Sequence, residues 1–97
     1  MLIVSQKGKI RVNYDNVAYI FTKEENGFLL ICANLINGND VELYRSLSEE
    51  NREKALVSLD EAIIDLERYK HLKTSNISYI KDIDEELCIF YMGECLA

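Results

Sequence analysis

The sequence predicts an α+β domain: an antiparallel β-meander of about five strands, one long helix packed on it, and a C-terminal strand. Three observations carry this prediction. Short apolar or alternating runs separated by turn residues fill the first half, one long amphipathic run begins near Ser48, and an apolar run closes the chain. Residues 1–97 have the length of a single domain, and 48% hydrophobic residues can build a core without a cofactor.

The strands of the first half are predicted from alternation and turn residues. Residues 1–5 and 9–14 are separated by a short polar turn, and the second run alternates with period two, so together they predict a hairpin. Residues 17–22 are β-branched, aromatic and apolar on both faces. We therefore expect this strand to be central in the sheet.

Two Asn-Gly steps, at residues 26–27 and 37–38, predict the following turns, because both residue types tolerate positive φ. The first step joins the preceding strand to a strand at residues 28–33. The second leads to a strand at residues 41–45. Alternation along that strand turns Tyr44 away from its apolar side, so we expect Tyr44 on the surface.

The run from Ser48 to about Leu72 predicts the helix. Its apolar residues fall within an arc of roughly 140°, as expected of a helix laid against a sheet. Ser48 is the expected N-cap, and Ser46 with Glu49 forms a rival capping box. The residues expected on the buried face are Ala55, Leu56, Leu59, Ala62, Ile63, Leu66 and Tyr69.

Val57 and Ile64 break the amphipathic pattern, because they lie opposite the buried face of the helix. Isolated aliphatic side chains are common on protein surfaces, so the pair can be without function. Alternatively, the pair forms a self-association or partner surface, or the C-terminal tail covers it. These alternatives stay open at the level of sequence.

The end of the chain predicts one further strand at residues 87–92, with Gly93 ending it. This strand can return to a sheet edge or pair with the same strand of a second copy. Phe90 and Tyr91 are therefore candidate partner-binding residues. Residues 77–83 are compatible with either a strand or a short helix.

Residue types that carry chemistry are sparse. The only histidine, His71, stands at the expected helix C-terminus, where its positive form is favoured. The three cysteines lack the paired spacing of a zinc or redox site, and the acidic group at residues 82–86 lacks the pattern of a calcium loop. We therefore expect no enzyme, no catalytic residues, no cofactor and no metal.

Net charge and hydropathy limit the partners and the cellular location that we expect for the protein. A net charge of −6 argues against direct binding of nucleic acid. The chain has no apolar run near 18 residues and no signal-peptide pattern at its start. We expect a cytoplasmic protein that is not inserted in a membrane.

Residues 2–6, residues 14–20, the strand at residues 42–44 leading into residues 48–50, and the closing residues 90–92 resemble small uncharacterised bacterial proteins of prophages and mobile elements. The resemblance spans most of the chain and contains no catalytic motif. It implies an accessory phage or mobile-element protein, and it supplies no site residues.

Three functional hypotheses follow. The first is a non-enzymatic protein-interaction domain that binds a protein partner and forms a homo-oligomer. The second is a phage-type inhibitor of a host defence or DNA-binding protein, and the third is a small ligand-binding module that resembles pleckstrin-homology-like folds. Under the first hypothesis, the residues expected to bind a partner are Val57, Ile64, Tyr44, Phe90 and Tyr91. The acidic surface expected to act in the second is Glu24, Glu25, Asp82, Asp84, Glu85 and Glu86.

Overall fold

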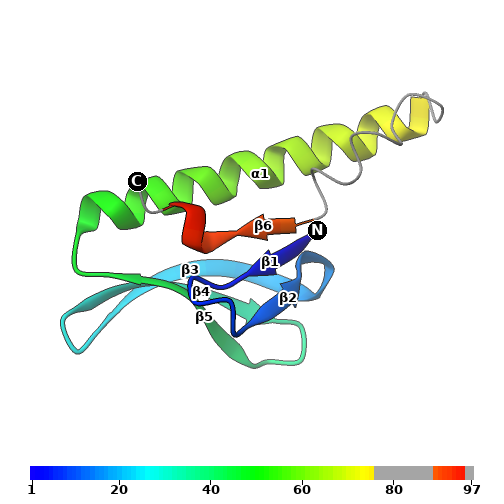
Figure 1. Ribbon diagram of the computed structural model, residues 1–97. Helices are drawn as coiled ribbons and strands as arrows, with labels where there is room; N and C mark the ends of the chain where they lie inside the picture. Colours follow the sequence, from blue (N-terminus) through cyan, green and yellow to red (C-terminus); the bar gives the residue numbers. More distant parts are fainter. Residues whose placement is uncertain (76–88, 96–97) are drawn as a thin grey trace.

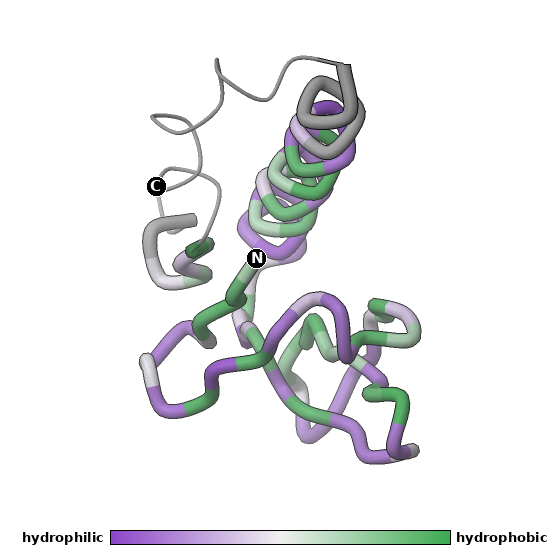
Figure 2. Tube along the Cα trace, turned by 90° about the vertical axis from the view of Figure 1, so that its right-hand side faces the viewer, coloured by the Kyte–Doolittle hydropathy of each residue, from purple (hydrophilic) through white to green (hydrophobic). Residues whose placement is uncertain are grey.

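The computed structural model describes residues 1–75 and 89–95, and it confirms the α+β class (Figure 1). Two three-stranded sheets lie beneath one long helix. Figure 2 shows that helix as a separate layer above the strands, with hydrophobic residues in both layers. The expectations for residues 77–83 and for the acidic residues 82–86 lie outside the described part of the chain.

The first sheet has the order β2-β1-β6 and unites the two ends of the described chain. Strand β1 (Leu2–Val4) pairs antiparallel with β2 (Arg11–Asn13), which confirms the first hairpin. Strand β6 (Ile89–Tyr91) pairs with β1 in parallel. The last strand thus returns to a sheet edge, which is one of the two arrangements that the sequence left open.

The second sheet has the order β3-β4-β5 and forms an antiparallel meander. Its strands are β3 (Val17–Glu25), β4 (Phe28–Leu35) and β5 (Asp40–Ser46). The β3–β4 turn contains Asn26 and Gly27 with φ of 53° and 83°, the positive values that the Asn-Gly step predicted.

The prediction that the strand at residues 17–22 is central is wrong, because β4 occupies the centre and β3 lies at the edge. Apolar side chains of β3 do point to both faces of the sheet, but only one of these faces is covered by the core. Ile20 packs against the core, whereas 56% of the Tyr19 surface is exposed. A strand that is apolar on both faces therefore does not have to be buried.

The strands form two sheets rather than one meander because a short 3-10 helix, η1 (Tyr14–Asn16), redirects the chain between β2 and β3. Gln6, just after β1, then links the two sheets. Its backbone N–H donates to the Leu43 carbonyl oxygen at 2.8 Å, and its side-chain Oε1 accepts from the Arg45 N–H at 3.0 Å.

Helix α1 (Glu49–Ser75) begins as predicted. Ser48 Oγ accepts a hydrogen bond from the Asn51 N–H at 3.2 Å, which is the geometry of an N-cap. Ser46 Oγ accepts from the Ser48 N–H at 2.9 Å, so both serines order the start of the helix. Ala55 and Leu59 are fully buried, which confirms the expected buried face.

One main core joins α1 to both sheets. A second short 3-10 helix, η3 (Met92–Cys95), completes it by inserting Met92 beside α1. Among the described residues, no helix is both long and apolar enough to cross a membrane. The buried members of this core are Ile3, Val12, Ile31, Ala33, Leu43, Tyr44, Ala55, Leu59 and Met92.

Candidate protein-interaction surface

The five residues expected to bind a partner lie in three separate places. Val57 and Ile64 are each 51% exposed on α1, as their position opposite the buried face predicts. Phe90 and Tyr91 lie on β6, and Tyr44 lies on β5. The structure therefore does not gather them into one site.

The expectation that Tyr44 is on the surface is wrong, because Tyr44 is fully buried in the main core. The reason is a β-bulge in β5. Ile31 of β4 pairs with Tyr44 while the next residue, Cys32, pairs with Glu42, so Leu43 is an additional residue. The bulge shifts the alternation and turns both Leu43 and Tyr44 inward.

Phe90 and Tyr91 point to opposite faces of the first sheet. Phe90 pairs with Ile3 and packs against the main core, where it is partly buried. Tyr91 pairs with the buried Val4 and is itself exposed. Strand alternation separates the two neighbours, and Tyr91 is the more accessible of the two.

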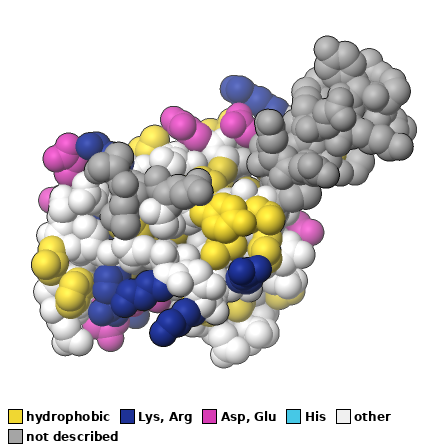
Figure 3. Space-filling model, in the orientation of Figure 1, with side chains coloured by type: hydrophobic (Ala, Val, Ile, Leu, Met, Phe, Trp, Pro, Cys, Tyr) yellow, Lys and Arg dark blue, Asp and Glu magenta, His cyan; other side chains and the backbone are white. Residues whose placement is uncertain are grey.

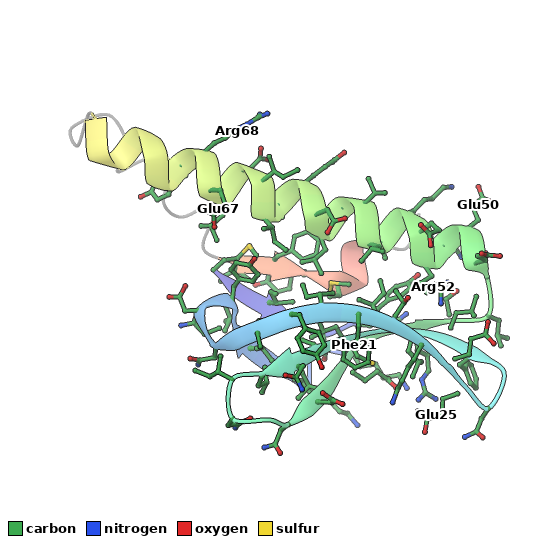
Figure 4. The ribbon with its side chains drawn as sticks, turned by 180° about the vertical axis from the view of Figure 1, so that it is seen from behind. Phe21, Glu25, Glu50, Arg52, Glu67 and Arg68 are labelled. Atoms are coloured by element: carbon green, nitrogen blue, oxygen red, sulfur yellow. The ribbon has the colours of Figure 1, made fainter. Side chains whose placement is uncertain are left out.

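A groove that the sequence did not predict runs between β3 and α1. It has a volume of about 250 Å³. Tyr14 and Val17 lie at one end, and Ile63 and Asp60 contribute the helical wall. In Figure 4, which views the molecule from behind, β3 runs below α1 on this side. The groove is lined by Tyr14, Val17, Ala18, Tyr19, Ile20, Asp60 and Ile63.

Strand β3 offers its outer edge beside this groove. Among the described strands, β3 pairs with β4 alone, over a length of nine residues. A bulge at Ala18, between the pairs of Val17 and Tyr19, interrupts the register next to the groove. An edge strand of this length presents unpaired backbone donors and acceptors to another chain.

The helical wall of the groove continues onto the exposed side of α1. Asp60 lies three residues after Val57 and four before Ile64, so the three side chains are neighbours on the helix surface. Glu53 and Glu67 repeat the position of Asp60 two turns earlier and two turns later. The wall therefore combines a row of exposed carboxylates with two exposed aliphatic side chains.

The structure brings Asp60 and Ile63 of α1 beside β3, which the helical pattern alone did not indicate. The sequence feature that could have indicated an exposed apolar surface on β3 is the run at residues 17–22, which is apolar on both faces. If such a strand lies at a sheet edge with only one face covered, its other apolar face is exposed. Of the predicted acidic surface, Glu24 and Glu25 are exposed on β3. Its other four members lie outside the described residues.

Metal-ligating side chains and the Cys32 thiol are the candidates for chemical reactivity in the part of the chain that the structure describes. No group of three or more His, Cys, Asp or Glu side chains there could hold a metal ion. Cys32 is buried on β4, and burial raises the pKa of its thiol. A raised pKa lowers the thiolate fraction near neutral pH, so Cys32 is poorly suited to be a nucleophile.

Comparison of the chain with protein-family models, curated proteins and solved structures finds no match.

Proposed function

We propose that this protein is a non-enzymatic protein-interaction domain that binds an extended segment of a partner protein along the edge of β3. The observation that carries the proposal is the nine-residue edge strand lying directly beside a groove lined mainly by apolar side chains. In this mode of recognition, backbone hydrogen bonds to the edge supply affinity, and pockets for alternate side chains supply specificity.

The groove supplies the pockets. Side chains of an added strand alternate in direction, so every second one faces the helix side of the sheet. There the groove presents Ile20 and Ile63, which are half-buried and already in contact with the core. An aliphatic or aromatic side chain of the partner would cover this apolar surface and gain from its burial.

The charge of the helical wall defines the partner further. Asp60 lines the groove, Glu53 and Glu67 lie seven residues before and after it on the same side of α1, and the whole chain has a net charge of −6. A partner segment that alternates apolar residues with Lys or Arg complements this wall. A second copy would bring two such rows toward each other, so the proposed partner is a different protein.

The test uses a fluorescein-labelled peptide in which valine and lysine alternate, with binding followed by fluorescence anisotropy. We expect Asp60→Lys to weaken binding at least tenfold, because Asp60 lines the groove. Glu61→Lys is the matched control, because it makes the same charge change at the next position, about 100° around the helix. Equal loss of binding in the two variants would show a response to net charge and refute the site.

Amide hydrogen exchange on the same complex tests strand addition. We expect the peptide to slow exchange in β3, at residues 17–22, because added backbone hydrogen bonds protect the edge. A bound peptide that leaves β3 exchange unchanged would overturn strand addition.

A further inference from the structure

A second groove is lined by residues of the β1–β2 turn and β5, and it shares no residue with the groove beside β3. It has a volume of about 340 Å³ and lies between the β1–β2 turn and β5. Ile10 and Leu43 provide its apolar lining. Lys7, Lys9 and Arg45 line it with positive charge.

Backbone and side-chain hydrogen bonds hold the walls of this basic groove in place. Gln6 ties the end of β1 to β5 through the Leu43 carbonyl and the Arg45 N–H. Across the β1–β2 turn, the Ser5 N–H donates to the Ile10 carbonyl oxygen at 2.8 Å, and Ser5 Oγ accepts from the Ile10 N–H at 3.1 Å. The two lysines therefore project from a fixed turn.

The groove is positively charged, whereas the molecule as a whole is negatively charged. Residues 1–14 contain three basic and no acidic side chains, although the chain as a whole has a net charge of −6. Lys and Arg side chains gather over this region in Figure 3. The one acid of the groove, Glu42, is engaged by Arg45 at 2.7 Å. Lys7 and Lys9 thus set the charge offered to a ligand.

We propose that this basic groove binds an acidic segment of a partner protein, with its carboxylates beside Lys7 and Lys9 and an aliphatic side chain over Ile10 and Leu43. Charge complementarity selects the acidic partner. The apolar lining favours a peptide over an inorganic anion. A nucleic acid is disfavoured, because its many phosphates would approach a protein of net negative charge with few neutralising contacts. This site is independent of the groove beside β3.

The probe is a fluorescein-labelled peptide in which glutamate and leucine alternate, titrated with the full chain at low and moderate salt. We expect the double variant Lys7→Glu with Lys9→Glu to weaken binding at least tenfold. The control is Lys23→Glu with Lys54→Glu, which changes net charge equally at exposed positions on β3 and α1. We expect the control to retain binding within about twofold.

Three outcomes would overturn the proposal. Equal weakening by both double variants, at unchanged circular dichroism, would show a response to net charge alone. Displacement of the peptide by millimolar inorganic phosphate would assign the groove to a small anion. Binding of an oligothymidylate that competes with the peptide and is lost in the Lys7 and Lys9 variant would assign it to a nucleic acid.

Discussion

The side-chain Oε1 of Gln6 accepts a hydrogen bond from the backbone N–H of Arg45 at 3.0 Å, which joins the turn after β1 to the outer edge of β5. The two residues are 39 positions apart in the chain. Edge strands need cover for their backbone groups, and here one glutamine provides it. The two sheets and the basic groove between them therefore depend on this residue.

Gln6→Ala removes this hydrogen bond and leaves the Arg45 N–H without that partner. We expect a loss of about 1 kcal/mol in the free energy of unfolding, since the bond is only partly buried. Urea denaturation followed by circular dichroism measures it. Lys7→Ala, at the exposed next position, is the control and should change stability little. A Gln6→Ala protein as stable as the control would show that the link is not needed.

Gly93 lies so close to β1 that a side chain does not fit. A Cβ at this position would lie 2.9 Å from the backbone carbonyl oxygen of Gln6. We expect Gly93→Ala to destabilise the protein by roughly 1–3 kcal/mol, because backbone must move to make room. Thermal unfolding measures the effect, and an unchanged midpoint would mean that η3 shifts at no cost.

Burial raises the pKa of the Cys32 thiol above its ordinary value of 9.0. The folded protein therefore holds this proton at pH values where the unfolded chain releases it. The corresponding stability is complete below about pH 9 and is lost as the pH rises toward the higher pKa of the folded state. We expect the unfolding midpoint of the wild type to fall more steeply than that of Cys32→Ala as the pH rises above about 9. Parallel pH profiles would contradict this.

Val57 and Ile64 contribute little to the core, because half of each side chain is exposed. We expect the double variant Val57→Asp with Ile64→Asp to unfold at nearly the wild-type midpoint. Light scattering should give the mass of a monomer for both proteins, since copies would oppose their carboxylate rows. A wild-type dimer that this variant dissociates would instead establish self-association through the helix.

The features that the sequence predicted correctly are local. The buried stripe of α1, its Ser48 cap and the Asn-Gly turns depend on residues within a few positions of one another. The exposure of Val57 and Ile64 follows from the same helical periodicity. The exposed side of α1 could therefore be predicted before the fold was known, whereas the groove beside β3 could not.

The features that the sequence did not predict depend on distant partners. Tyr44 is buried because a bulge opposite Ile31 and Cys32 shifts its strand, and no local pattern marks that bulge. The edge position of β3 is set by which strand pairs with which, not by its own apolar content. Both facts are decided by pairing across the sheet.

The parallel pairing of β1 with β6 also constrains how the molecule forms. Leu2 and Ile89 come from the two ends of the described chain, so this contact closes a loop that contains the second sheet and the helix. Such a contact is entropically costly until the intervening elements have compacted. The meander and α1 can assemble from nearer neighbours, so we expect the pairing of β6 with β1 and the insertion of Met92 to form late in folding.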